Sequence, residues 1–437
     1  MAERSEAAED QAVRDASAAY SVETDIATTE DVPPGYKRTE AGVLPSEWEV
    51  SSVGEEFTLQ LGKMLDSAKN TGDPKPYIGN RAVQWGRVDL EEVSSVRMKR
   101  SELKRYRVDK GDLLVCEGGE IGRSAIWNAP IPECYYQKAL HRLRPKRGYS
   151  PFLMMSFLNL WASSGMLANF VTQTSIAHLP KDKLELVPLP VPTPDEQRAI
   201  ATALSDADAL IESLDRLIAK KRAIKKAAMQ QLLTGQTRLP GFTGEWETKR
   251  LGDISTIAMG RTPSRNNTAF WGRGHVWLSI ADLHGKVVKE SKEQITDLAA
   301  AGMTPIPEGT LLMSFKLSIG RLCFAGCDLF TNEAICSFTD LQADEEFIYY
   351  ALSRTDFSLY GKQAVKGYTL NSESLKLVEV FLPPEDEQTA IATVLSDMDT
   401  EIEALDRRRD KARQTKQGMM QQLLTGRVRL VAPEVAA

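Results

Sequence analysis

The chain contains one long segment twice. Asp195–Leu239 returns without a gap as Asp386–Leu430, and about 28 of the 45 aligned residues are identical, far above chance. Matched residues continue upstream at lower density, at Trp48 and Trp246, Gly62 and Gly260, Gly111 and Gly309, and Gly122 and Gly320. Such a chain consists of two similar modules in tandem, and we expect its function to have two similar halves.

Each copy of this segment carries the signals of one long helix. In the first copy Thr193 offers an N-cap, Pro194 stands at the first helical position, and Glu196 follows three residues after the cap. Gly235 and Gly426 follow the two Leu-Leu-Thr sequences and can take the left-handed conformation that ends a helix. A helix of about 40 residues is about 60 Å long, so it must project from a compact domain.

Apolar residues recur at a spacing of three and four along both helices, as in a coiled coil. They are Leu204, Ala207, Ile211, Leu214 and Ile218 in the first helix and Leu395, Met398, Ile402 and Leu405 in the second. The second stripe is lost at Arg407–Arg409, so the seams differ and we expect each helix to pair with its sister rather than with a second chain.

Identical polar residues in the two copies indicate that both helices meet similar partners. The candidates for helix pairing and for docking of partner subunits are Glu196, Gln197, Ile200, Leu204, Ile211, Leu214, Gln230, Gln231, Glu387, Gln388, Ile391, Leu395, Ile402, Leu405, Gln421 and Gln422.

The diverged parts, about residues 49–191 and 247–382, have a mixed composition with many short strands. The predicted strands, separated by Gly and Pro, include Leu113–Val115, Ser124–Trp127, His275–Ile280 and Thr310–Met313. Apolar stretches at Pro151–Ala168 and Glu346–Tyr360 predict one packed helix in each part. At 437 residues the chain exceeds the size of a single core, which agrees with several domains.

The net charge of −6 is unevenly distributed. Residues 1–33 carry nine acidic side chains against Arg4 and Arg14, so the rest of the chain is close to neutral and the acidic balance does not exclude a nucleic-acid partner. This acidic segment has no helical apolar pattern, and we expect it to be disordered. Without a membrane-spanning stretch or a signal-peptide pattern, the expected location is cytoplasmic.

Residue patterns for resident chemistry are weak. The odd set of five cysteines favours reduced thiols, although Cys323, Cys327, Cys336 and His284 could in principle form a zinc site that the first copy lacks. The sequence has no phosphate-loop, Asn-Pro-Pro-aromatic methyltransferase or HExxH motif. The glycines of Gly118–Gly122 lack the lysine of a phosphate loop, so they are better explained by turn geometry.

The motifs resemble the specificity subunit of type I restriction–modification systems. The resemblance covers Gly35–Leu430 and rests on GYKRTEAGVLPSEWEV, on LPLPVPTPDEQRAIATALSDADALI, on QQLLTG and on their second copies. It implies an α+β fold in which two tandem mixed α/β target recognition domains are separated by two long conserved helices that pair as an antiparallel coiled coil. The implied division is a tail (1–34), recognition domain 1 (35–191), spacer helix 1 (192–238), recognition domain 2 (239–382), spacer helix 2 (383–430) and a C-terminal tail (431–437).

In that family each recognition domain binds one half of a split site in double-stranded DNA. The resemblance therefore implies a non-catalytic subunit that docks two methyltransferase subunits and joins restriction/translocase subunits, with no membrane partner. It implies no cofactor or metal in this chain, and S-adenosylmethionine, ATP and Mg²⁺ on the partner subunits. Half-sites about one DNA turn, about 34–36 Å, apart would present the same side of the duplex to both domains.

Candidate DNA contacts are the basic, amide and aromatic residues of the diverged domains, because Lys and Arg favour phosphates, Arg favours guanine, and Asn and Gln favour adenine. They are Lys63, Lys69, Lys75, Arg81, Gln84, Arg87, Arg123, Gln137 and Lys138 in the first domain, and Arg261, Arg265, Asn266, Asn267, Arg273, Lys316, Arg321, Lys366 and Tyr368 in the second. Arg123 and Arg321 occupy equivalent places in the two copies. This fits a contact with the DNA backbone or a structural role better than discrimination between different half-sites.

Two rival functions belong to other classes. A tandem scaffold would organise proteins through its helices and would ignore DNA sequence. A nuclease would use carboxylates such as Asp112, Glu117 and Glu120, but neither glutamate recurs in the second copy, and a strand-end loop explains the same cluster.

Overall fold

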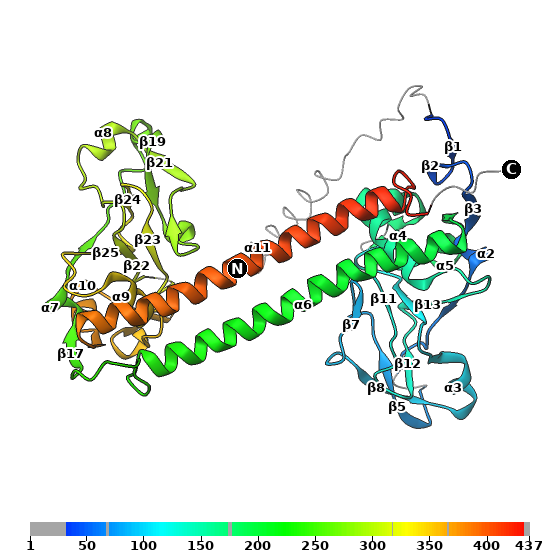
Figure 1. The fold of residues 1–437 in the computed structure, drawn as a ribbon, viewed down its shortest axis with the longest axis horizontal. Helices are drawn as coiled ribbons and strands as arrows, with labels where there is room; N and C mark the ends of the chain where they lie inside the picture. Colours follow the sequence, from blue (N-terminus) through cyan, green and yellow to red (C-terminus); the bar gives the residue numbers. More distant parts are fainter. Residues whose placement is uncertain (1–31, 67–69, 174–176, 317, 365–366, 432–437) are drawn as a thin grey trace. The chain divides into compact units, whose positions relative to one another are not determined.

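The computed structural model describes residues 32–66, 70–173, 177–316, 318–364 and 367–431. It divides into two compact units, unit 1 (Met1–Glu212 and Asp410–Ala437) and unit 2 (Ser213–Arg409). Most of the predicted acidic tail and residues 432–437 lie outside the described residues. Each unit combines helices with mixed sheets, so the predicted α+β class is confirmed (Figure 1).

The two long helices begin at matching residues. Helix α6 spans Pro194–Leu232 and α11 spans Glu385–Leu423, each with 39 residues. Although Pro384 replaces the capping residue Thr193, both positions offer a backbone carbonyl to the first turn, to Gln197 at 2.8 Å and to Gln388 at 3.0 Å. The lost side-chain cap therefore does not shift the helix start. Beyond the helix ends, Gly235 and Gly426 adopt φ of 67° and 66°, as predicted.

Unit 1 contains several small sheets. Their strand orders are β11-β10-β13-β4, β8-β5-β12-β9, β16-β3, β1-β2, β6-β7 and β14-β15. The strands are β1 (Tyr36–Thr39), β2 (Gly42–Pro45), β3 (Glu49–Ser52), β4 (Phe57–Leu61), β5 (Asp73–Ile78), β6 (Val83–Gln84), β7 (Arg87–Val88), β8 (Ser94–Met98), β9 (Arg107–Val108), β10 (Leu113–Cys116), β11 (Ser124–Ile126), β12 (Cys134–Tyr136), β13 (Leu140–Pro145), β14 (Thr172–Gln173), β15 (Ala177–His178) and β16 (Pro188–Val191). The shorter helices are α2 (Val53–Glu56), α3 (Arg100–Tyr106), α4 (Pro151–Ser164), η1 (Met166–Phe170) and α5 (Lys181–Glu185).

Unit 2 has a comparable set of elements. Its strand orders are β18-β25-β22-β23-β20, β21-β19-β24, β17-β28 and β26-β27. The strands are β17 (Glu247–Arg250), β18 (Thr256–Met259), β19 (Trp271–Leu278), β20 (Val287–Val288), β21 (Glu293–Ile295), β22 (Leu311–Ser314), β23 (Leu322–Ala325), β24 (Phe330–Thr331), β25 (Ile335–Thr339), β26 (Lys362–Ala364), β27 (Gly367–Thr369) and β28 (Glu379–Leu382). The shorter helices are α7 (Leu251–Ile254), η2 (Thr268–Phe270), η3 (Ile280–Asp282), α8 (Asp297–Ala300), α9 (Glu345–Leu352), η4 (Phe357–Leu359) and α10 (Ser372–Lys376).

The diverged parts share a backbone plan. Parallel pairing joins β5 to β12 in unit 1 and β19 to β24 in unit 2. A glycine directly follows β4 in unit 1 and β18 in unit 2, and each glycine lies against the second strand of the parallel pair. A Cβ at Gly62 would come within 2.3 Å of the carbonyl oxygen of Tyr136 in β12, and a Cβ at Gly260 within 2.3 Å of that of Thr331 in β24. This close approach explains why both copies need glycine there.

Each unit has a core that includes both long helices. In unit 1, Ile200 of α6 and Met420 of α11 belong to the same buried cluster as Trp48. In unit 2, Leu232 of α6 and Ile391 of α11 join the corresponding cluster. Both helices therefore contribute to both cores, and Leu204, Leu395 and Met398 of the predicted apolar stripes belong to them.

The predicted strands and helices are found with small differences. The strands expected at Leu113–Val115, Ser124–Trp127 and Thr310–Met313 are β10, β11 and β22, and β19 starts earlier than the predicted His275. The helix expected at Pro151–Ala168 is interrupted, because Gly165 takes a φ of 74° between α4 and η1. The helix expected at Glu346–Tyr360 is likewise split into α9 and η4.

Candidate nucleic-acid interface and helix contacts

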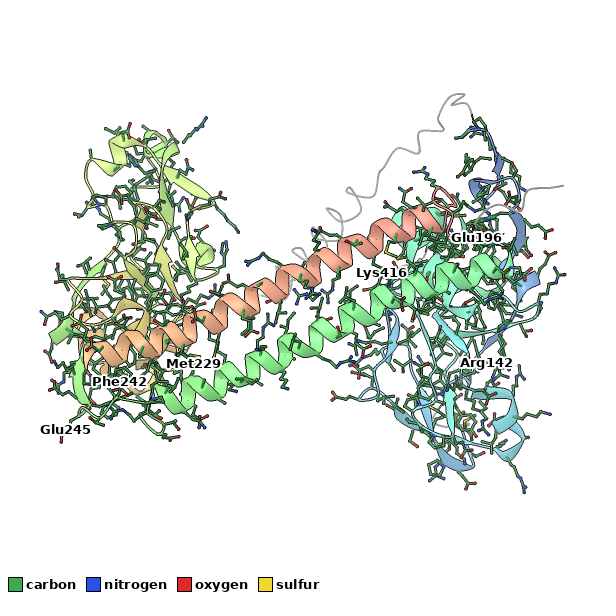
Figure 2. All side chains as sticks on the ribbon, in the orientation of Figure 1. Arg142, Glu196, Met229, Phe242, Glu245 and Lys416 are labelled. Atoms are coloured by element: carbon green, nitrogen blue, oxygen red, sulfur yellow. The ribbon has the colours of Figure 1, made fainter. Side chains whose placement is uncertain are left out.

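A buried glutamate joins three segments of unit 1. Glu196, in the first turn of α6, is 1% exposed. Its Oε2 accepts a hydrogen bond from the indole of Trp48 at 2.7 Å and one from the guanidinium of Arg429 at 2.9 Å. Arg429 also reaches Glu47 at 3.0 Å. Arg429 and Glu196 form an ion pair, and the hydrogen bond to Glu196 raises the pKa of Arg429 (Figure 2 labels Glu196).

Unit 2 repeats this arrangement with the equivalent residues. Glu387 is 0% exposed and accepts two hydrogen bonds of 2.5 Å from Arg238 and one of 3.2 Å from the indole of Trp246. We call the sets Glu196–Trp48–Arg429 and Glu387–Trp246–Arg238 the terminal clamps. Each ties the start of one long helix to the segment that follows the other helix and to the opening of a diverged domain.

The glutamine beside each clamp glutamate has an equivalent role in both units. Gln197 accepts a hydrogen bond from the backbone N–H of Ser150 at 3.2 Å, and Gln388 accepts one from Asp344 at 2.9 Å. Ser150 and Asp344 are the N-caps of α4 and α9. Both glutamines also donate to the prolyl carbonyl five residues before them. The repeated Asp-Glu-Gln sequence therefore fixes each long helix to its neighbouring domain.

Equivalent ion pairs connect the long helices within each unit. Lys416 of α11 pairs with Asp208 of α6 in unit 1, at 2.5 Å, and Lys225 of α6 pairs with Asp399 of α11 in unit 2 (Figure 2 labels Lys416). Asp399 has a further partner, because the hydroxyl of Tyr350 donates to it at 2.7 Å. In each unit the early part of one helix meets the late part of the other, so the predicted antiparallel pairing is confirmed.

The candidates for helix pairing and docking separate by exposure. The buried ones are Glu196, Gln197, Ile200, Leu204, Leu214, Glu387, Gln388, Ile391, Leu395 and Ile402, and the half-buried ones are Ile211 and Leu405. The exposed ones are Gln230, Gln231, Gln421 and Gln422. Among the candidates, these four glutamines near the C-terminal ends of α6 and α11 are the ones with exposed side chains.

Two lysine candidates of unit 1 are paired with acidic side chains of the same domain. Lys63, 12% exposed, pairs with Glu102. Burial acts to raise the pKa of Glu102, but the hydrogen bonds from Lys63 and from the Lys99 backbone outweigh it and lower that pKa. Lys75 contacts both carboxylate oxygens of Glu133, at 2.9 and 2.8 Å, and holds the pKa of Glu133 below its ordinary value.

Arg123 and Arg321 make corresponding hydrogen bonds to carbonyl groups of the protein backbone. Arg123, with a side chain 14% exposed, donates to the carbonyl of Asn80 at 3.2 Å, just beyond β5. Arg321 is exposed and donates to the carbonyl of Ile280 at 3.5 Å, just beyond β19. The two arginines, which are equivalent in the sequence, thus also make equivalent hydrogen bonds in the two domains.

The other candidates of unit 1 are more accessible. Arg81 and Arg87 are exposed and pair with Glu92 and Asp89, while Gln84 donates to the Arg81 carbonyl at 2.7 Å. Gln137 is half-buried, Lys138 is exposed, and Lys69 lies outside the described residues.

Four candidates of unit 2, Arg261, Arg265, Asn266 and Asn267, lie in the segment between β18 and β19. Arg265 pairs with Glu293 there, and Asn267 caps η2 through its side chain. Arg261, Asn266 and Arg273 are exposed, and Lys316 is half-buried beside the ring of Phe315. Lys366 and the side chain of Tyr368 lie outside the described part.

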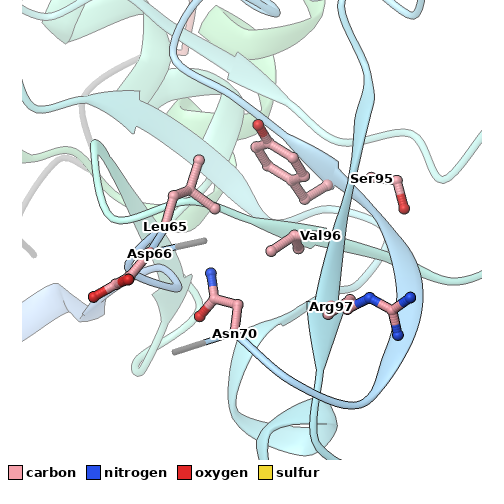
Figure 3. A pocket seen from close by; sticks show the side chains of 7 residues that line it. Leu65, Asp66, Asn70, Ser95, Val96 and Arg97 are labelled. Carbon is pink, nitrogen blue, oxygen red and sulfur yellow. The ribbon is translucent and has the colours of Figure 1, made fainter. Parts of the chain in front are cut away.

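A hollow of about 280 Å³ in unit 1 does not collect these candidates. It is lined by Leu65, Asp66, Asn70, Tyr77, Ser95, Val96 and Arg97 (Figure 3). One cation and one anion stand there among apolar and small polar side chains, which gives no pattern typical of a catalytic centre.

The carboxylates of the nuclease alternative have separate structural partners. Asp112, 4% exposed, accepts hydrogen bonds from Arg144 at 2.6 and 2.8 Å, which raises the pKa of that arginine. Glu120 instead accepts the indole N–H of Trp85 at 2.7 Å. Within the described ranges, no three His, Cys, Asp or Glu residues come together in a group that could hold a metal ion.

The five cysteines are free thiols. Burial raises the pKa of Cys323 and of Cys336 to about 12, so both are protonated at neutral pH. In the part of the chain that the structure covers, no helix is long and apolar enough to cross a membrane.

A family model matches more than half of the chain. Its description is type I restriction modification DNA specificity domain, and it matches residues 45–220 and 243–412. Two matches to one family reproduce the tandem plan that the repeated segments indicate.

Curated relatives and solved structures agree with this match. A putative type I restriction enzyme MjaX specificity subunit from Methanocaldococcus jannaschii is 24% identical over 90% of this chain and 97% of its own length. The MjaIX specificity subunit of the same organism is 31% identical over 38% of this chain and 41% of its own length. A type I restriction–modification S subunit from M. genitalium has the same fold, with a TM-score of 0.56, 15% identity and coverage of 86% of this chain and 96% of that one.

Proposed function

Because the chain belongs to the type I restriction modification DNA specificity domain family, we propose that it is the subunit that selects the DNA sequence for a type I restriction–modification complex. Its two tandem recognition domains each bind one half of an asymmetric, bipartite site. The half-sites differ because the domains carry different exposed side chains on a shared backbone plan. This chain performs no catalytic step.

The observation that carries this proposal is the repetition of the terminal clamps. Unit 1 and unit 2 hold the start of a long helix with the same three residue types, although their exposed candidate DNA contacts differ. A constant frame with variable surfaces suits a protein that must present two different recognition surfaces to one continuous ligand. A scaffold without sequence selectivity would not require the two surfaces to differ.

The long helices set the distance between the half-sites and dock two methyltransferase subunits. The exposed pairs Gln230–Gln231 and Gln421–Gln422 occupy equivalent positions on α6 and α11, which supports two equivalent docking surfaces. Side-chain amides there can donate and accept hydrogen bonds without the cost of burying a charge. Restriction/translocase subunits join this assembly, and the partner subunits bind S-adenosylmethionine, ATP and Mg²⁺.

The test is a base-resolution map of DNA methylation in the host, with and without this gene. We expect deletion to abolish N6-methyladenine at one split, asymmetric motif. Re-expression of the intact chain should restore that motif, whereas a chain with Gln230, Gln231, Gln421 and Gln422 all changed to Ala should fold but restore little methylation. An unchanged map in cells that express the chain and its methyltransferase partner would favour the scaffold alternative instead.

A further inference from the structure

One loop of the second recognition domain is held by side-chain hydrogen bonds to its backbone. The loop of residues 261–267 joins β18 to η2, and two indole groups bind its backbone: Trp277 donates to the carbonyl of Arg261 at 3.1 Å, and Trp271 donates to that of Ser264 at 3.2 Å. The two indole rings pack edge to face, with centroids 5.0 Å apart. The path of the loop is therefore fixed by side chains of β19.

Arg265 reinforces the loop. Its guanidinium makes two hydrogen bonds to Glu293, at 2.6 and 2.8 Å, and lies 3.8 Å from the centre of the Trp271 ring. These hydrogen bonds hold the pKa of Glu293 below its ordinary value. A guanidinium that is hydrogen-bonded to a carboxylate and stacked on an aromatic ring has few N–H groups left to bind the edge of a DNA base. We therefore interpret Arg265 as a support for the loop.

Two more side chains of the loop are engaged. The hydroxyl of Thr262 donates to Glu333, and the side chain of Asn267 accepts the backbone N–H of Ala269 at 3.1 Å. Pro263 is buried. The loop therefore keeps its own shape before any ligand binds, so little conformational entropy would be lost on binding.

The remaining side chains of the loop are those of Arg261, Ser264 and Asn266. All three are exposed, and within the described residues their side chains have no hydrogen bond or ion pair. Arg261 and Asn266 carry the two groups that bind purines through paired hydrogen bonds. A guanidinium matches O6 and N7 of guanine, and a carboxamide matches N6 and N7 of adenine.

We propose that Asn266 and Arg261 are specificity-determining residues of the second recognition domain, with Asn266 on an adenine and Arg261 on a guanine of the same half-site. The proposal rests on the proposed function, since it requires that this domain bind duplex DNA. It assigns the base contacts to two residues and removes Arg265 and Asn267 from that role.

The first domain cannot use the equivalent residue in this way. Lys63 corresponds to Arg261, and the backbone N–H groups of both residues make equivalent hydrogen bonds of 2.8 Å, to Tyr136 and Thr331. The ammonium of Lys63, however, pairs with Glu102 and is largely buried. The same backbone position thus carries a cation paired with a carboxylate in the first domain and, within the part of the chain that the structure describes, an exposed cation without an ion pair in the second. This difference fits two different half-sites.

The test uses the full chain in complex with its methyltransferase partner and measures methylation at the wild-type motif and at sites with one base changed. For Asn266→Ala we expect discrimination at one adenine position of one half-site to fall about 5- to 150-fold, with the other half-site unaffected. Arg261→Ala should do the same at one guanine position. Asn266→Asp keeps the size of the side chain but cannot donate to N7, so it should also lose the adenine preference.

Arg250→Ala is the matched control. Arg250 is an exposed arginine on β17, which lies at the opposite end of unit 2 from β19 and β21, so the motif should not change (Figure 1). Thermal unfolding checks that each variant is folded. An unchanged motif for a folded Asn266→Ala chain, or an even loss at all sites for Arg261→Ala, would overturn the assignment. The absence of any split motif with the wild-type chain would instead refute the proposed function, and this assignment with it.

Discussion

Glu387 is a carboxylate with no exposed surface, and its stability in the fold depends on its two donors. Removal of one partner from a buried ion pair leaves an uncompensated charge, which costs more than the pair itself contributes. Arg238 supplies two of the three hydrogen bonds and retains 29% of its side-chain exposure, so water compensates only in part for its loss.

Arg238→Ala should therefore lower the free energy of unfolding clearly more than the loss of an exposed arginine would, because Glu387 stays buried without its main donor. Chemical denaturation of the purified chain measures this, through the midpoint of the transition that includes unit 2. The control Arg250→Ala removes the same side chain from an exposed site with no side-chain partner in the described residues and should change stability by less than about 0.5 kcal/mol. Equal midpoints for the two variants would show that the clamp contributes little.

His141 gives unit 1 a dependence on pH. It is buried, its Nε2 lies 2.9 Å from the carbonyl of Leu179, and burial lowers its pKa. Below about pH 6.5 the unfolded chain therefore takes up a proton that the folded protein does not. The contribution of the neutral His141 imidazole to the free energy of unfolding is fully present above that pH. It is lost as the pH falls, by at most about 1.4 kcal/mol per pH unit, until the lowered pKa of the folded protein is reached.

We expect His141→Gln to be less stable at neutral pH but to lose less further stability between pH 7 and pH 5.5 than the parent chain. Denaturation midpoints across that range measure the difference. If His141→Gln and the parent chain have parallel pH profiles, the buried imidazole is not the source.

Some residue roles were not predictable from local patterns. The Asp-Glu-Gln sequence indicated similar partners for both copies, but Glu196 and Glu387 bind residues of their own chain. Their partners Arg429 and Arg238 are distant in the sequence, so periodicity and spacing do not connect them. The available signal was that Trp48 and Arg429 each have an identical residue in the second copy, as expected of groups that contact the repeated glutamate.

At the scale of elements, the helix pairs are similar but not equal. Asp208 in unit 1 pairs with Lys416 and has a side chain 40% exposed. Asp399 in unit 2 pairs with Lys225, accepts the hydroxyl of Tyr350, and has a side chain 23% exposed. The second helix contact is therefore joined to α9 of its recognition domain through a tyrosine that α4 does not have.

Asp399→Asn should consequently destabilise the protein more than Asp208→Asn. We expect a loss of about 1–3 kcal/mol for Asp399→Asn, because a half-buried charged hydrogen bond is weakened, and less than about 1 kcal/mol for the more exposed pair of Asp208. Denaturant titrations of both single variants give the comparison, and Tyr350→Phe should reproduce part of the larger loss. A greater effect of Asp208→Asn would contradict this difference between the units.

Whole elements were more predictable than their contacts. The start of α6 followed from Pro194 and the ends of both long helices from Gly235 and Gly426, because these residues act locally. Pro384 did not shift the start of α11, since its carbonyl still serves the first turn. The candidate DNA contacts could be selected by residue type but not sorted, because only tertiary structure shows that Lys63 is paired and Asn266 is not.

At the scale of the whole molecule, the two halves hold their long helices with equivalent terminal clamps but carry different exposed side chains. The ion pairs Lys416–Asp208 and Lys225–Asp399 fix the same register of the antiparallel helices in unit 1 and unit 2. An insertion that preserves this register must therefore be made in both helices at once. Such a change tests directly the proposal that the helices set the spacing of the bipartite site.

Seven residues inserted after Glu212 and seven after Arg409, with the apolar pattern of the seam continued, keep both pairs of clamps and ion pairs in place. Each helix becomes longer by about 10 Å, at about 1.5 Å per residue. Because the base pairs of a duplex are about 3.4 Å apart, the gap in the methylated motif should grow by about three base pairs while both half-site sequences stay the same. A methylation map of cells that carry the extended chain shows the gap, and seven residues inserted in α6 alone, which breaks the register, should abolish methylation. If the doubly extended chain folds and methylates the original motif with its gap unchanged, the helices do not set the spacing, even though the two recognition domains bind the two half-sites.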